Sequence, residues 1–245
     1  MDKEAEGGKS HTFKQNWKQK AEQVPHSSEI PPSIQKPAFH PEAMRQLVHM
    51  SGLLFVLLAQ FMDKSAAGLI FILIAVFFLA YSEHVSRCEK NHRTILSRIE
   101  CRIRDMAFWL ERKDSRKPFA GAFWFYMGIG LSFLLFPLKA ASAAGLVLAV
   151  SDSLSTIIGV RFGSHKLLGK KSWEGTGAFL ISSFLLCLLF FPPVLSLLAA
   201  LVATLAELLP EARTLSSPRL RIISDDNLLI PLLAGLTLTV LGAFI

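Results

Sequence analysis

Long apolar stretches alternate with charged segments from about residue 46 to the last residue of the chain. A hydrocarbon core about 30 Å thick is crossed by roughly 20 helical residues, and seven of the stretches come near that length. The predicted spans lie near 46–62, 66–82, 120–138, 140–160, 175–191, 194–209 and 226–245. The pattern therefore predicts an all-α integral membrane protein with about seven transmembrane helices.

The positions of the basic residues test this count independently. Of 26 Lys and Arg, seven precede the first span, ten lie in 83–118, four in 161–174 and three in 210–225. The other two, Lys64 and Lys139, fall on the opposite side. Because cytoplasmic segments are enriched in Lys and Arg, we expect a cytoplasmic N-terminus and cytoplasmic loops at 83–118, 161–174 and 210–225. A count of six or eight spans would break this asymmetry.

The polar segments outside the spans differ in character. Residues 1–43 contain no apolar run and no visible secretory signal, so we expect a disordered cytoplasmic tail ahead of a membrane-embedded domain at 44–245. Within loop 83–118, apolar residues recur at helical spacing from Ile95 to Leu110. This segment is predicted to be an amphipathic helix that lies either on the cytoplasmic leaflet or on the protein's own surface. The three cysteines show no spacing typical of disulfides or zinc.

Asp152 is an acid inside an apolar segment. A carboxylate in hydrocarbon is costly unless it has a partner, so such a residue is a candidate for function. The preceding residues are rich in Ala, Ser and Gly, which allows close helix packing. Asp152, Ser155 or Thr156, and Gly159 follow at steps of three or four. They therefore share one helix face, which we expect to point into the bundle.

A glycine- and lysine-rich loop follows this helix and suggests a phosphate site. Glycines let the backbone approach a ligand closely, and cations neutralise phosphate oxygens. A nearby acid can hold Mg²⁺, which usually binds one or two carboxylates and the phosphates, and the candidates are Asp152 and Glu174. Alternatively, the cations are ordinary charges of a cytoplasmic loop. The predicted phosphate-binding residues are Gly159, Arg161, Gly163, Lys166, Lys170, Lys171, Ser172, Glu174 and Gly175.

Further acids lie near the ends of the last two predicted spans. Glu207 ends the sixth span, and Asp225, Asp226 and Asn227 open the seventh. These oxygen ligands belong to the same face of the membrane and are candidates to complete a metal site or to stabilise a base. One of the two aspartates is instead expected to cap the last helix, a common role for Asp.

Two other groups are candidates for binding or supporting a substrate. Arg45 and His49 are four residues apart and share a helix face at the start of the first span. Glu111 and Lys117 lie just before Pro118, where the charged loop turns into the third span. In both cases the alternative is that these residues only mark the membrane interface, where charged and polar side chains such as Arg and His often lie.

Four motifs, in order, resemble the family of CTP-dependent polyprenol and diacylglycerol kinases, which includes dolichol and phytol kinases. Its members carry an Asp, spaced glycines and a Lys-Ser-x-Glu-Gly run, then an Asp-Asn-x-x-x-Pro run near the end. Ser151, Ser155 and Gln46 replace a Gly, an Ala and a Lys of that pattern. The matching residues are Arg45 with His49; Lys117-Pro118-Phe-Ala-Gly121; Asp152, Gly159, Gly163, Lys171, Ser172, Glu174 and Gly175; and Asp226-Asn227-Leu-Leu-Ile-Pro231.

The resemblance implies transfer of the γ-phosphoryl group of CTP to the hydroxyl of a membrane lipid, with Mg²⁺ or another divalent cation. The acceptor would be a polyprenol or dolichol, a phytol-type alcohol or diacylglycerol, and Asp152, Glu207 and Asp226 are the catalytic candidates. The run Arg161-Phe-Gly-Ser-His-Lys166 also resembles phosphatidate cytidylyltransferases, which make CDP-diacylglycerol. A transporter is a third hypothesis. No nucleic-acid partner is expected, and the membrane is a bacterial inner membrane or the endoplasmic reticulum, with the active site facing the cytoplasm.

Overall fold

The computed structural model describes residues 46, 49–87, 119–214 and 225–244. The predicted N-terminal tail, the amphipathic segment at 95–110 and three site candidates lie outside the described residues. These candidates are Arg45, Glu111 and Lys117.

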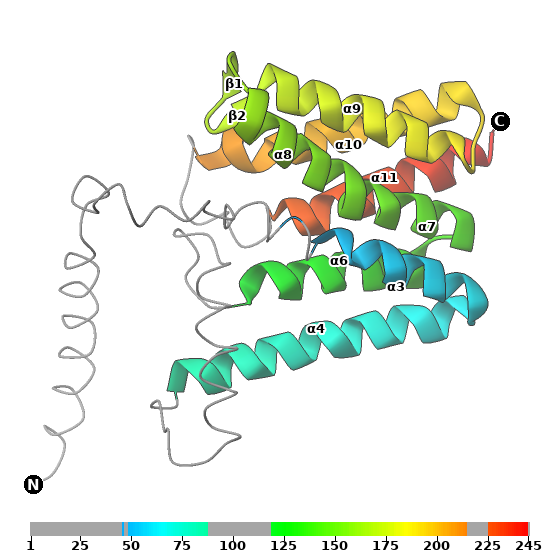
Figure 1. Cartoon of the computed structure of the whole chain (residues 1–245). Helices are drawn as coiled ribbons and strands as arrows, with labels where there is room; N and C mark the ends of the chain where they lie inside the picture. The colour runs from blue at the N-terminus through cyan, green and yellow to red at the C-terminus, as the bar shows by residue number, and fades with distance from the viewer. Residues whose placement is uncertain (1–45, 47–48, 88–118, 215–224, 245) are drawn as a thin grey trace, which may run out of the picture. The chain divides into compact units, whose positions relative to one another are not determined.

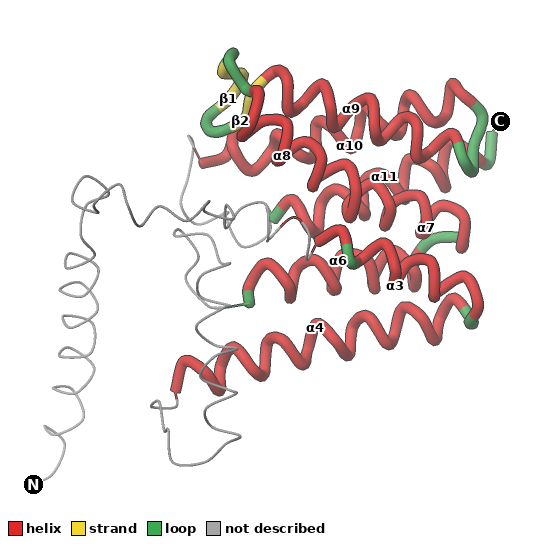
Figure 2. The backbone as a smooth tube through the Cα atoms, in the orientation of Figure 1, coloured by secondary structure: helices red, strands yellow, loops and turns green. Residues whose placement is uncertain are grey.

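Each predicted span coincides with a helical segment (Figures 1 and 2). Because these stretches are apolar over many residues, the helix satisfies every backbone hydrogen bond internally, as hydrocarbon requires. The helices are α3 (Gly52–Leu58) with the 3₁₀ turn η2 (Ala59–Phe61), α4 (Lys64–Arg87), α6 (Ala120–Leu135), α7 (Leu138–Leu146) joined to α8 (Asp152–Phe162) by the π turn η3 (Val147–Ser151), α9 (Trp173–Leu188), α10 (Pro193–Thr214) and α11 (Asp226–Gly242).

Three of these helical segments are long and apolar enough to cross a membrane: Lys64–His84, Leu138–Phe162 and Pro193–Glu211. The other apolar helices have 10–17 residues. The architecture is therefore mostly helical and compatible with an all-α membrane protein.

Helix α7 lies in the core of the bundle. It contacts α3, α6, α9 and α11, and every residue from Ala140 to Leu146 is buried. Around it, α4 packs on α6, α6 on α11, α10 on α11, and α9 lies against both α8 and α10. The small residues of α7 allow this close approach from several sides, as the sequence predicted.

The helices alternate in direction, so the segments that join them fall at two ends of the bundle. Figure 1 shows α4, α8 and α10 ending at the same end at which α6, α9 and α11 begin. The chain ends with α11 at the opposite end. The described helix ends that border 88–118 and 215–224 therefore lie at one end of the bundle, which also carries the small hairpin described next.

A β-hairpin, which the sequence pattern does not predict, lies within the segment predicted to be a loop at 161–174. Strand β1 (Lys166–Leu168) pairs antiparallel with β2 (Lys171–Ser172). Gly169 takes a φ of +55° at the first turn position, where two-residue hairpins favour glycine. The predicted loop at 210–225 is also shorter than expected, because α10 continues through Pro210 to Thr214 despite the backbone hydrogen bond that a proline removes.

Candidate functional site

Lys171 and Glu207 form a buried ion pair at the hairpin end of the bundle. Lys171, on β2, donates from Nζ to Glu207 Oε1 on α10 at 2.7 Å. Ser155 Oγ, on α8, donates to the same carboxylate oxygen at 2.8 Å. The side chain of Glu207 is 0% exposed and that of Lys171 is 16% exposed. Three segments of the chain are therefore joined at one carboxylate that is shielded from water.

Two further acids act on the same cation. Burial alone would lower the pKa of Lys171, but the charges of Glu207, Asp152 and Asp226, with the Glu207 hydrogen bond, raise it above 10.5. Lys171 is therefore charged at neutral pH. We call Lys171, Glu207, Asp152 and Asp226 the Lys171 cluster. It brings together the three acids that the sequence proposed as catalytic.

Asp152 and Asp226 are each the first residue of a helix. Asp152 is the first residue of α8, directly after the π turn η3, and is only 4% exposed. Turns of this type often occur at functional sites. Asp225 caps α11, because its Oδ1 accepts hydrogen bonds from Asn227 N at 3.1 Å and from Asn227 Nδ2 at 3.0 Å. The prediction that one of the two aspartates is a cap is thus confirmed, and Asp226 is the one whose charge raises the pKa of Lys171.

The predicted glycines hold α8, β2 and α9 close together. A Cβ atom on Gly175 would lie 2.8 Å from the backbone oxygen of Ser155 and 3.1 Å from Gly159 Cα. A Cβ atom on Gly163 would lie 2.9 Å from Ser172 Cβ. Ser172 also caps α9, since its Oγ accepts from Gly175 N at 3.2 Å. These close approaches place β2 so that Lys171 reaches Glu207.

The other predicted phosphate-binding cations lie on the surface. Arg161, Lys166 and Lys170 are exposed, and Lys171 is the member of this group that the structure places with the acids. The hairpin turn is held by Glu211, whose Oε2 accepts from Lys170 N at 3.4 Å. Glu211 is not among the site residues predicted from the sequence. Its spacing of four residues from Glu207 on one face of α10 was the available signal.

Glu174 is engaged at the surface of the hairpin end. Its carboxylate accepts from Ser164 N at 3.1 Å and His165 N at 3.2 Å, and Oε1 lies 2.8 Å from His165 Nδ1. These contacts, the His165 ring first, lower the pKa of Glu174 to about 2. Glu174 lies in the first turn of α9, before the apolar part of that helix.

The predicted pair of metal ligands, Asp152 and Glu174, is not brought together. Phe162 is ten residue steps, or about 15 Å, along α8 from Asp152, and the Glu174 carboxylate binds just beyond Phe162. Among the described residues no group of three His, Cys, Asp or Glu side chains is arranged to hold a metal ion.

The start of the first helical segment lies beside α8. Gln46 is 1% exposed, and its backbone oxygen accepts from Ser153 Oγ at 3.4 Å. The ring of His49 meets that of Phe125 edge-on, with centroids 4.9 Å apart. Gln46 therefore approaches the residue that follows Asp152, whereas the described ring contact of His49 is with α6.

Comparison with known proteins finds two relatives without an assigned activity. The chain is 26% identical over 208 residues to an uncharacterized protein of Rickettsia prowazekii, covering 81% of this chain and 94% of the relative. It is 33% identical over 126 residues to an uncharacterized protein of Methanocaldococcus jannaschii, covering 51% of this chain and 59% of that relative. No family model and no solved structure matches the chain.

Proposed function

We propose that the protein is a CTP-dependent lipid kinase that transfers the γ-phosphoryl group of CTP to the hydroxyl of a membrane lipid. The Lys171 cluster is the observation that supports this most. It joins Asp152 and Lys171, from the segment that resembles the kinases' nucleotide-associated motif, with Asp226 from the separate C-terminal motif. Residues of two motifs more than 50 positions apart thus act on one charge.

The chemistry needs positioning and charge stabilisation above all. Lys171 is charged, nearly buried and held by a flexible four-carbon chain, so it suits a phosphate oxygen in place of Glu207 Oε1. A carboxylate of the Lys171 cluster would be available as general base to accept the proton of the lipid hydroxyl once Lys171 turns to the phosphate. Asp152 is our choice for this role, which leaves Glu207 for a metal ion. The exposed cations Arg161, Lys166 and Lys170 would attract the nucleotide to the hairpin end.

A divalent cation fits the same cluster in one respect. Glu207 Oε2 is buried and makes no hydrogen bond to the described residues, so its lone pairs are available. Carboxylate oxygens are the ligands that Mg²⁺ takes in proteins. Glu207 with Asp226 would therefore hold the metal, in place of the pair predicted from the sequence. When bound, Mg²⁺ supplies positive charge to the nucleotide phosphates.

In this proposal the protein crosses a bacterial inner membrane or the endoplasmic reticulum membrane about seven times. The hairpin end of the bundle faces the cytoplasm, where CTP is available. The concentration of Lys and Arg in the segments connected to that end supports this orientation.

Purified full-length protein given labelled CTP, Mg²⁺ and a panel of lipid alcohols tests the proposal. We expect phosphorylated alcohol and CDP. With Asp152→Asn we expect at least a 100-fold loss of turnover, the usual scale for a lost catalytic group. Asp63→Asn is the control. Asp63 is far from the Lys171 cluster in the sequence, and its Oδ1 caps α4 by accepting hydrogen bonds from Ser65 N and Ala66 N.

Two results would replace the kinase by another function. CDP-lipid and pyrophosphate formed from phosphatidate would identify a cytidylyltransferase, which the stretch from Arg161 to Lys166 also resembles. Substrate uptake by proteoliposomes without any nucleotide would identify a transporter. Full turnover by the Asp152→Asn protein would remove that residue from the mechanism.

A further inference from the structure

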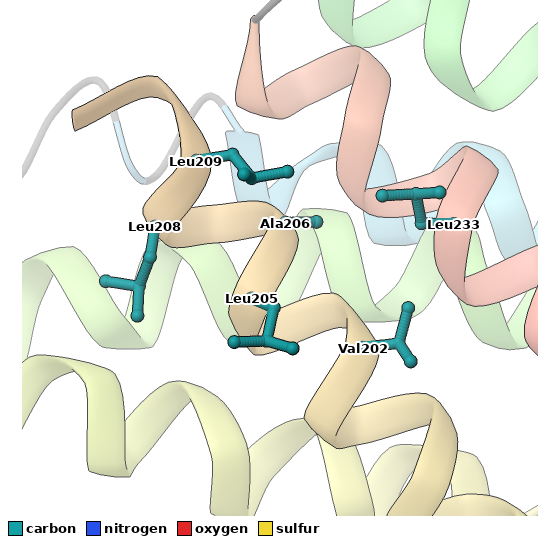
Figure 3. Close-up of a pocket in the computed structure, with 6 residues that line it drawn as sticks. All are labelled: Val202, Leu205, Ala206, Leu208, Leu209 and Leu233. Atoms are coloured by element: carbon teal, nitrogen blue, oxygen red, sulfur yellow. The ribbon is translucent and has the colours of Figure 1, made fainter. Parts of the chain in front are cut away.

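An apolar groove of about 480 Å³ runs between α10 and α11 (Figure 3). Leu209 from α10 and Leu233 from α11 point towards each other across it, and the short side chain of Ala206 leaves space between them. All the side chains that line the groove are apolar: Val202, Leu205, Ala206, Leu208, Leu209 and Leu233.

The groove follows the two helices that carry acids of the Lys171 cluster. Ala206 and Leu208 flank Glu207 in the sequence, so the groove and the ion pair occupy the same turn of α10. On α11, Leu233 comes seven residues after Asp226, which is two turns and about 10 Å along the same face. A chain lying in the groove would therefore have one end near the carboxylates.

We infer that this groove binds the hydrocarbon chain of a single-chain isoprenoid alcohol, with its hydroxyl directed to the Lys171 cluster. The inference rests on the proposed kinase activity and narrows its substrate class. Helix α10 is long and apolar enough to cross a membrane, so the medium around it is expected to be lipid. An apolar groove on such a helix is filled by hydrocarbon.

The chemistry of the lining separates the possible acceptors. Diacylglycerol carries ester groups next to its hydroxyl, and burying their carbonyl oxygens without donors is unfavourable. The side chains that line the groove offer no donor. An isoprenoid alcohol has one hydrocarbon chain directly on its hydroxyl carbon. Its chain therefore enters the groove without burying a polar atom that lacks a hydrogen-bond partner.

Photolabelling of the full-length protein in nanodiscs tests the groove without any nucleotide. The probe is a diazirine-bearing geranylgeraniol, and labelled peptides are identified by mass spectrometry. We expect label on residues 202–209 and on Leu233, removed by excess geranylgeraniol and retained with excess diacylglycerol. Label mainly on the exposed face of α4, or equal competition by diacylglycerol, would overturn the inference. Because the readout needs no turnover, it separates failure of the groove from failure of the kinase proposal.

A matched pair of variants tests the same groove by activity. Leu209→Trp fills it, whereas Leu197→Trp adds the same bulk to an exposed position of α10 outside the lining. We expect KM for the alcohol to rise about 10-fold with Leu209→Trp alone, the scale of a mismatch in an apolar pocket, while KM for CTP stays constant. Val202→Phe is the second filling variant should Leu209→Trp not fold. An unchanged KM for the alcohol in a folded filling variant contradicts the assignment.

Discussion

Removing the cation of the Lys171 cluster should destabilise the protein far more than removing the charge of its closest acid. With all four groups ionised, one lysine faces three carboxylates, a formal net charge of −2. Lys171→Met leaves three carboxylates without their cation. Glu207→Gln leaves Lys171 with two acids and keeps the side-chain shape. Lys171→Met and Glu207→Gln should therefore cause unequal losses of stability, although the two residues form one ion pair.

The magnitudes follow from burial. Breaking a buried ion pair by removing one partner costs about 3–5 kcal/mol, and Lys171→Met belongs in that range because Glu207 is 0% exposed. Glu207→Gln should cost about 1 kcal/mol, the scale of one weakened hydrogen bond. The double variant restores the formal charge of −2. We expect it to be more stable than Lys171→Met alone, with a coupling energy of about 1–3 kcal/mol.

The measurement is the free energy of unfolding in mixed detergent micelles, followed by tryptophan fluorescence. Lys139→Met is the control, because Lys139 is exposed and outside the cluster. Equal losses for Lys171→Met and Glu207→Gln would refute the reasoning, since they would mean that Asp152 and Asp226 do not act on Lys171. A double variant less stable than both single variants would refute it as well.

Three further outcomes are expected. Gly175→Ala should lower the free energy of unfolding by about 1–3 kcal/mol through overpacking. Gly177→Ala should be neutral or slightly stabilising, because nothing lies within 4 Å of the new Cβ atom. The same unfolding assay compares the two variants. By NMR, the Glu174 carboxylate should titrate at a pKa of about 2, and His165→Ala should move this pKa towards 4.5. The contribution of Glu174 to stability is therefore present above pH 4.5 and lost as pH falls towards 2. A titration near 4.5 in the unmodified protein would contradict the contacts with Ser164 and His165. Because the pKa of Lys171 is raised above 10.5, its contribution is complete below pH 10.5 and lost as pH rises through the raised value, and unfolding curves should show this alkaline loss in the unmodified protein but not in Lys171→Met.

The helices and the buried acids were predictable because both depend on strong, local signals. The apolar stretches of the sequence are helical wherever the structure describes them. Asp152 and Glu207 are costly in apolar surroundings, so their presence indicates partners that stabilise them. The burial of Asp152 and Ser155 on one face of α8 also follows from their spacing.

The hairpin and the metal ligands could not be predicted in the same way. Strands of three and two residues are too short to show alternation, which leaves the turn at Gly169 as the main sequence signal. Glycine is selected both where a ligand approaches and where two backbones pack, so the sequence alone did not separate these roles for Gly159 and Gly175. Asp152 and Glu174 are both candidate Mg²⁺ ligands by residue type, but the length of α8 separates them.

The π turn before Asp152 sets the rotation of α8 relative to α7, and so the face on which Asp152 lies. Hydrogen bonds from i to i+5 in η3 place an additional residue in one turn, whereas an ideal α-helix rotates about 100° per residue. Deleting one residue from Val147–Ser151 would therefore allow a continuous α-helix, and it would turn either the core face of α7 or the carboxylate of Asp152 by about a quarter of a circle. Only a five-residue π turn at Val147–Ser151 keeps α7 packed on its neighbours and Asp152 in the Lys171 cluster at the same time.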